Sequence, residues 1–380
     1  MLSACSTRAS RMRRCLRSAS RNCSGYRMRT DRSEFDPEVY EFYKEALEGA
    51  GFAAAFSASD VPRLREAEIK GHAAHLDPYE VREKIDLTIP RRGAGYLPAR
   101  VYVPEGAADA AGQVPVILYF HGGGFIMGSI EDHDPLCGKL TDAACAIVIA
   151  AEYRLAPEHP FPACIEDAVL LAEWAAENAA RFGGDPERIM AAGDSSGATI
   201  SAALALISKA ANSREAFSAS CGQAETANTG ETASVNRGQA PSVPQISGLI
   251  LLYGIYGCVS LEDSESAKLY GQGGYVLPVA AAEKMMQLYI PEGTDQNDER
   301  LWPGRAADLS GMPPAIIVTA EFDPLRDDGE CFARRLKESG CRAELIRMEG
   351  MMHGFALYWQ RFKRAEEMLD HIGSIVRDRF

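Results

Sequence analysis

Short apolar runs alternate with segments of helical periodicity along most of the chain, and this alternation limits the fold more than any other feature. The central apolar runs are Val114–Tyr119, Ala146–Ala151, Ile189–Ala192 and Leu249–Leu252. Apolar strands joined by crossover helices form a mainly parallel sheet with helices on both faces. The sequence therefore predicts an α/β fold.

The flanking segments extend this pattern towards both ends of the chain. Further strands are expected at Val81–Ile89, Tyr96–Val103, Ala315–Thr319 and Ala343–Arg347. Helices are expected from Asp36 to Gly51 and over Val61–Lys70, Cys164–Arg181, Gly197–Ala210, Gly329–Ser339 and Gln360–Arg377. A chain of 380 residues, 46% of them hydrophobic, can bury a large core without disulfides or metal ions. We expect one large α/β domain that carries a smaller lid.

Two segments depart from the pattern. The first 30 residues hold eight arginines and no acidic residue, and they lack the apolar stretch of ~7–15 residues found in a secretory signal. We expect residues 1–33 to be a basic, disordered leader. Residues 211–245 are mostly small or polar, with Phe217 as their single aromatic residue. Since so few apolar groups cannot offset the entropy of ordering, a disordered insertion is expected there.

Charge and composition exclude several classes of function. A net charge of −13 argues against a nucleic-acid surface, which needs clustered positive charge. No apolar run approaches the ~20 residues that span a bilayer. The ten cysteines contain no C-x-x-C pair and no cysteine–histidine spacing typical of a metal site. We expect free buried thiols in a reducing cytoplasm, and no metal ion, nucleic acid or membrane span.

The strongest motif is Gly193-Asp194-Ser195-Ser196-Gly197, which follows an apolar strand and opens a helix. A G-x-S-x-G sequence in this context predicts a sharp turn that lifts the hydroxyl of Ser195 above the sheet. The flanking glycines allow the close approach of neighbouring strands and helices. Ser195 is therefore a candidate nucleophile.

A second motif, His121-Gly122-Gly123-Gly124, directly follows the apolar run that ends at Phe120. Three glycines could form a merely flexible turn. An enzyme that generates a tetrahedral oxyanion, however, needs backbone N–H groups aimed at one point without side chains in the way. The combination with the Ser195 motif favours this second interpretation.

An acid and a histidine follow the last two strands. Asp323 comes after the strand at Ala315–Thr319, and His353 comes after the final strand. The chain order Ser, Asp, His is that of α/β-hydrolases. Asp323 is also a plausible helix N-cap, and the neighbouring Asp327 and Asp328 are alternatives that we expect to be solvated.

These motifs together resemble those of the hormone-sensitive-lipase-like family of α/β-hydrolases, which includes many microbial carboxylesterases. The resemblance covers about residues 35–210 and 246–380, and it includes the segment Tyr153–Pro162. It implies an α/β-hydrolase fold in which Ser195 is the nucleophile, Asp323 the acid and His353 the base. The implied oxyanion hole consists of the N–H groups of Gly123, Gly124 and Ser196. Ser196 stands where the family usually has alanine.

The resemblance also implies how the chain is divided. The catalytic core would occupy residues 81–254, which include the 211–245 insertion, and residues 301–380. Cap segments would lie at 34–80 and 255–300. The expected pocket walls are Phe125, Tyr270, Tyr275, Met285, Met286 and Tyr289.

The implied activity is cofactor-free hydrolysis of small acyl esters through an acyl-enzyme. A pocket of methionine and tyrosine suits short to medium acyl chains. Dimers are common in the resembling family, so a homodimer is the protein partner that this analogy suggests.

The sequence allows three alternatives to this function. An amidase, deacetylase or acyltransferase could use the same triad, because pocket shape selects the leaving group. A non-catalytic ligand-binding protein could share the fold, but the complete triad disfavours it. A metal site at His72 and His75 lacks the carboxylate ligands and the H-E-x-x-H pattern that would support it.

Overall fold

The computed structural model describes residues 35–42, 56–105, 113–222, 243–272 and 275–380. These residues belong to a single unit, Phe35–Phe380. The leader predicted at 1–33, residues 43–55 of the first expected cap segment and residues 223–242 of the expected insertion lie outside the described residues. Within the described part, no helix combines the length and apolar character required to cross a bilayer.

The described strands form one eight-stranded sheet in the order β1-β2-β4-β3-β5-β6-β7-β8. The strands are β1 (Glu83–Pro90), β2 (Tyr96–Val103), β3 (Val114–Phe120), β4 (Ile147–Ala151), β5 (Gly184–Asp194), β6 (Ile246–Leu252), β7 (Ala315–Phe322) and β8 (Ala343–Met352). Strand β2 is antiparallel to both of its neighbours, and all pairs from β4 to β8 are parallel. The prediction of a mainly parallel α/β sheet, in the form of an α/β-hydrolase fold, is confirmed.

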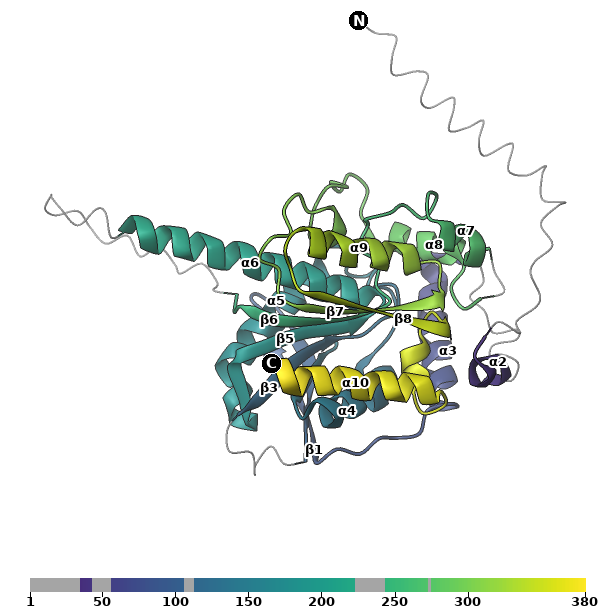
Figure 1. The fold of residues 1–380 in the computed structure, drawn as a ribbon, viewed down its shortest axis with the longest axis horizontal. Helices are drawn as coiled ribbons and strands as arrows, with labels where there is room; N and C mark the ends of the chain where they lie inside the picture. Colours follow the sequence, from purple (N-terminus) through teal and green to yellow (C-terminus); the bar gives the residue numbers. More distant parts are fainter. Residues whose placement is uncertain (1–34, 43–55, 106–112, 223–242, 273–274) are drawn as a thin grey trace, which may run out of the picture. The chain divides into compact units, whose positions relative to one another are not determined.

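Helices cover both faces of this sheet (Figure 1). They are α2 (Pro37–Phe42), α3 (Val61–Ala73), α4 (Ile130–Ala144), α5 (Ala163–Asn178), α6 (Ser196–Gly222), α7 (Glu265–Tyr270), α8 (Val279–Tyr289), α9 (Arg326–Glu338) and α10 (Lys363–Arg379). Helices α4 and α10 pack on one face, and α5, α6 and α9 pack on the other.

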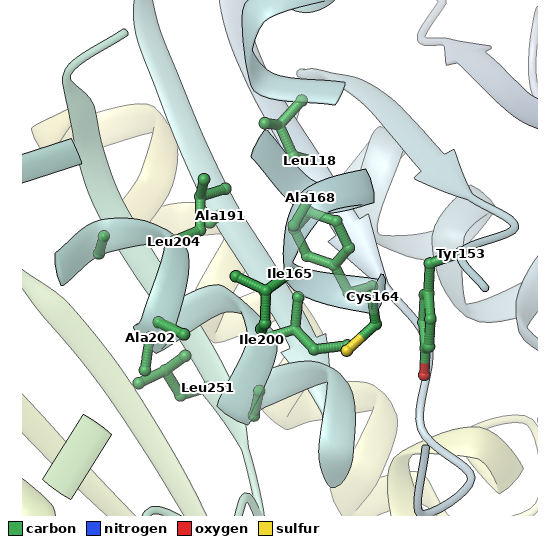
Figure 2. Close-up of a cluster of buried hydrophobic side chains, with 14 of the residues drawn as sticks. Leu118, Tyr153, Cys164, Ile165, Ala168, Ala191, Ile200, Ala202, Leu204 and Leu251 are labelled. Atoms are coloured by element: carbon green, nitrogen blue, oxygen red, sulfur yellow. The ribbon is translucent and has the colours of Figure 1, made fainter. Parts of the chain in front are cut away.

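The two faces have separate hydrophobic cores because successive strand residues point in opposite directions. In β3, Val116, Leu118 and Phe120 join the core on the α5–α6 face. Ile117 and Tyr119 join the core on the α4–α10 face. Figure 2 shows part of the first core, where Leu118 and Leu251 from the sheet meet Ile165 and Ile200 from α5 and α6.

The structure corrects the predicted start of the insertion. Helix α6 does not end at Ala210 but continues to Gly222, so the expectation of disorder is wrong for residues 211–222. Extending an existing helix adds one hydrogen bond for each residue that is fixed, whereas starting a new helix is unfavourable. Alanine-rich sequence can therefore continue a helix that is already anchored in the core, even when it contributes little apolar surface.

Helix α4 has no counterpart among the expected elements. Its first turn is capped by Ser129, whose side chain accepts a hydrogen bond from the N–H of Asp132. Pro135 interrupts the helical pattern in the sequence, and Asp132, His133 and Thr141 are buried. Because polar residues occupy part of the buried face, the apolar periodicity that marks a helix is lost.

Candidate active site

The register of the parallel strands brings four loops to one edge of the sheet. Phe120 at the end of β3 pairs with Gly193 in β5, and Phe322 at the end of β7 pairs with Met352 in β8. The residues that follow these strands therefore leave the sheet at its carboxyl edge. This edge of an open parallel sheet is where ligands bind.

Ser195 occupies a tight turn between β5 and α6. It has a φ of 51°, in the left-handed region that residues other than glycine rarely adopt. Its N–H donates to the carbonyl oxygen of Leu252, at a distance of 2.8 Å. A Cβ on Gly193 or Gly197 would overlap with the backbone, at Phe120 in both cases. The glycines thus allow helix α6 to start directly against β3.

Ser195, His353 and Asp323 form a continuous hydrogen-bonded chain. The Oγ of Ser195 lies 3.0 Å from Nε2 of His353. The Nδ1 of His353 lies 2.7 Å from Oδ2 of Asp323. Asp323 is 1% exposed and His353 is 9% exposed. This geometry fits a Ser-His-Asp triad, in which a hydroxyl lies within hydrogen-bonding distance of an imidazole that a carboxylate orients.

The second carboxylate oxygen of Asp323 stabilises the loop that contains this residue. Oδ1 accepts a hydrogen bond from the N–H of Leu325, 2.8 Å away, at the start of α9. The expectation that Asp328 is solvated is wrong, because Asp328 is 2% exposed. Its carboxylate accepts hydrogen bonds from the backbone N–H groups of Tyr256, Gly257 and Val259. Asp328 therefore fastens the segment after β6 to α9 and does not compete with Asp323.

The glycine loop after β3 adopts a conformation that only glycine accommodates readily. Gly123 and Gly124 have φ values of 111° and 61°, and a Cβ on Gly123 would overlap with the backbone of Met127. The ring of His121 stacks on Tyr153, and the Tyr153 hydroxyl donates to the His121 carbonyl. Burial, with the charge of His133 second, lowers the pKa of His121 to about 4, which favours its neutral form.

Three of the expected pocket residues contact the glycine loop or one another. The rings of Phe125 and Tyr289 stack with centroids 3.9 Å apart, and both residues are buried. The Tyr289 hydroxyl lies 3.2 Å from the thiol of Cys164. Met285, on α8, lies so close to Gly124 that a Cβ there would overlap with the methionine sulfur. Helix α8 therefore covers the glycine loop.

The remaining expected pocket residues lie elsewhere. Tyr270 and Tyr275 pack around Phe322, with ring centroids 5.5 and 6.1 Å from it. Phe322 immediately precedes Asp323, so these tyrosines border the acid loop. Met286 is partly buried and packs against the core on the α5–α6 face.

Sequence reasoning missed two residues that contact the glycine loop. Asp194 and His133 are both buried, and each lies within 3.3 Å of the backbone nitrogen of Gly122. A charged residue at the end of an apolar strand is the signal that could have identified Asp194. Within the described residues, no cluster of three or more His, Cys, Asp or Glu side chains is placed to hold a metal ion.

Comparison with known proteins identifies the family to which this chain belongs. A family model for the alpha/beta hydrolase fold matches residues 117–357. The carboxylesterase NlhH of Mycobacterium tuberculosis is 34% identical over 311 residues, covering 80% of this chain and 85% of the relative. The chain belongs to the hormone-sensitive-lipase-like family of α/β-hydrolases.

Other relatives of this hydrolase are likewise esterases. The arylesterase of Saccharolobus solfataricus is 33% identical over 321 residues, covering 84% of this chain and 90% of the relative. The crystal structure of EstE1, a thermostable carboxylesterase from a metagenomic library, matches with a TM-score of 0.71 and 32% identity. That match covers 86% of this chain and 99% of EstE1. The hydrolase is therefore a carboxylic ester hydrolase.

Proposed function

We propose that this enzyme hydrolyses short- to medium-chain acyl esters through an acyl-enzyme on Ser195. The observation that carries the proposal is the hydrogen-bonded chain from Ser195 through His353 to Asp323. Family membership supplies the reaction class, and the site geometry supplies the residues.

The expected mechanism has two steps. His353 takes the proton of Ser195 as the Oγ attacks the ester carbonyl, and then gives that proton to the leaving alcohol. Water next attacks the acyl-enzyme, with His353 again as base, and releases the acid. Asp323 holds Nδ1–H of His353, which keeps Nε2 free to accept the proton and stabilises the imidazolium that forms.

The oxyanion of each tetrahedral intermediate is assigned to the N–H groups of Gly123, Gly124 and Ser196. Two features support this assignment. Among the described residues, none of these three N–H groups donates a hydrogen bond to a protein acceptor. Ser196 also begins α6, so its N–H lies at the positive end of the helix dipole. Preorganised donors of this kind each contribute about 10²–10³ in rate.

The preference for shorter acyl chains is argued from the contacts above the glycine loop. Met285 lies over Gly124, and the next residue of the loop, Phe125, stacks on Tyr289 of the same helix α8. Side chains that occupy the space above the loop leave less room for a long acyl group. We therefore assign the acyl group to the side of the loop under α8.

The test is hydrolysis of p-nitrophenyl esters from acetate to decanoate by the intact enzyme and by Ser195→Ala and His353→Ala. We expect the highest kcat/KM on a short or medium chain, and losses of at least about 10⁴-fold in both variants. Activity that survives Ser195→Ala would refute the mechanism. An optimum on decanoate would refute the chain-length assignment while leaving the mechanism intact.

A further inference from the structure

The glycine loop begins at a buried charged pair that the mechanism above does not use. Asp194 lies between Gly193 and Ser195 at the end of β5, and His133 lies in the first turns of α4. Their side chains are 3% and 2% exposed, and His133 Nε2 lies 3.2 Å from Asp194 Oδ1. Removing two charged groups from water is costly, so such a pair calls for an explanation.

Asp194 connects the nucleophile's turn to the glycine loop. Its Oδ1 accepts hydrogen bonds from the N–H of Gly122, 2.9 Å away, and from the hydroxyl of Tyr119, 2.8 Å away. A Cβ on Gly122 would overlap with the other carboxylate oxygen, so glycine is what admits the carboxylate. Gly122 directly precedes the two glycines assigned to the oxyanion. One carboxylate thus ties the residue before Ser195 to the residue before those donors.

The contacts of His133 favour its doubly protonated form. Nδ1 lies 3.1 Å from the carbonyl oxygen of Ser129, and Nε2 faces Asp194. A neutral imidazole has a single N–H and could donate to just one of these acceptors. The N–H of Gly122 points at both Nε2 of His133, 3.3 Å away, and Oδ1 of Asp194, 2.9 Å away, and the shorter bond to Asp194 is the one that remains when Nε2 is protonated.

The electrostatic surroundings of His133 agree with this protonation. The titratable groups around it are Asp194, Asp132, Glu68, Glu152, His121, Tyr119 and, through Asp132, His72. Burial by itself lowers the pKa of His133, but the carboxylates of Asp194, Asp132 and Glu68 outweigh it and raise that pKa to about 9. Burial likewise raises the pKa of Asp194, but His133 and Tyr119 outweigh it and lower it below the usual value.

We propose that Asp194 and His133 act as a charged pair of positioning residues that holds the glycine loop in the conformation needed to stabilise the oxyanion. Asp194 fixes the start of the loop through Gly122, and the imidazolium of His133 keeps the Asp194 carboxylate ionised and oriented. The inference rests on the proposed hydrolytic function. It assigns these two residues no contact with substrate.

The test compares kcat, KM and inhibition by a trifluoromethyl ketone in Asp194→Asn and His133→Gln. The ketone forms a hemiketal with the serine, and its oxyanion occupies the same hole as the intermediate. We expect Asp194→Asn to lower kcat by about 10- to 100-fold, with KM within about twofold, and to weaken the ketone by a similar factor. A residue with a purely structural role would not weaken the ketone in proportion to kcat.

Asp134→Asn is the matched control. Asp134 follows His133 in α4 and pairs with Lys84 and Arg100, 2.8 and 3.0 Å away, but it has no contact with the glycine loop among the described residues. Its kcat and ketone affinity should stay within about twofold of the unmodified enzyme. If the two residues act as a unit, the Asp194→Asn/His133→Gln enzyme should lose less than the product of the single losses.

Folded Asp194→Asn and His133→Gln enzymes with unchanged kcat and ketone affinity would overturn the proposal. If neither variant folds, ¹⁵N-histidine NMR of the unmodified enzyme decides. Two N–H signals from His133 at pH 7 are expected, and a neutral tautomer would overturn the proposal. If Ser195→Ala abolishes activity but Asp194→Asn has no effect, the positioning role is refuted and the proposed function stands. Activity that survives Ser195→Ala refutes the proposed function itself.

Discussion

Ser195 shows how a single residue's conformation is set by its neighbours. A φ of 51° is energetically unfavourable for serine, and this conformation persists only where the surrounding structure imposes the turn. Here Gly193 and Gly197 let β3, β5 and α6 approach closely enough to impose it. This conformation places the Ser195 hydroxyl 3.0 Å from Nε2 of His353.

At this scale the sequence predicted the three side chains that the structure joins in a hydrogen-bonded chain, but not the buried pair beside the glycine loop. Ser195, Asp323 and His353 could be located because each follows a recognisable strand, in a known chain order. Asp194 and His133 could not be paired in advance, since their contact joins α4 to β5 across the sequence. The burial of Asp328 was also missed, because it depends on backbone donors from the segment after β6.

The raised pKa of His133 predicts a specific dependence of stability on pH. The pKa is about 9 in the folded enzyme and about 6.5 in an unfolded chain. A group whose pKa is raised by folding stabilises the folded state fully at pH values below its unfolded pKa. This stabilisation is lost as the pH rises through the folded pKa. The difference between the two pKa values corresponds to a contribution of His133 to the free energy of unfolding on the order of 3 kcal/mol.

Thermal unfolding of the unmodified enzyme and of His133→Gln, followed between pH 6 and pH 10 in steps, measures this contribution. The Tm of the unmodified enzyme should fall more steeply above about pH 7 than that of the variant. Parallel curves for the two proteins would show that His133 does not carry the charge.

Elements rather than single residues decide which surfaces meet at the site. Strand register aligns the ends of β3, β5, β7 and β8, and α8 then lies over the glycine loop. Strands β3, β5 and β7 were predictable because their apolar runs are buried on both faces. Helix α4 was not, since Pro135 and its buried polar residues remove the apolar periodicity on which a helix prediction relies.

The position of α8 predicts the effect of shortening Met285. In Met285→Ala, the space above Gly124 opens, so kcat/KM for octanoate relative to butyrate should rise by about 10-fold or more. The p-nitrophenyl ester series measures this ratio. Leu288→Ala is the control, because Leu288 belongs to the same helix and the same core but has no contact with Gly124 among the described residues. An unchanged ratio in Met285→Ala would remove α8 from the acyl site.

On the scale of the whole molecule, one sheet supports two cores, and the site lies where the strands end. The start of β6 is fixed independently of the segment that precedes it. The Ser208 hydroxyl donates to the carbonyl of Pro244 and accepts from the N–H of Ile246. Helix α6 and β6 therefore stay together through contacts made on either side of residues 214–242.

Replacing residues 214–242 by about six glycine and serine residues should therefore leave the site intact, since flexible linkers of that length reach across short gaps. Hydrolysis of the preferred ester is expected within about twofold of the full chain, with a similar Tm. A large loss of activity in a folded variant would show that this segment contributes to the substrate site, which the contacts of Ser208 do not predict.

Covalent trapping tests most directly whether Ser195 is the nucleophile. The enzyme is treated with a p-nitrophenyl phosphonate, and the modified peptide is identified by mass spectrometry while activity is followed. We predict one adduct per chain, on Ser195 and not on the adjacent Ser196, with activity lost in proportion to labelling. Full activity after complete labelling, or an adduct confined to another residue, would show that Ser195 is not the nucleophile.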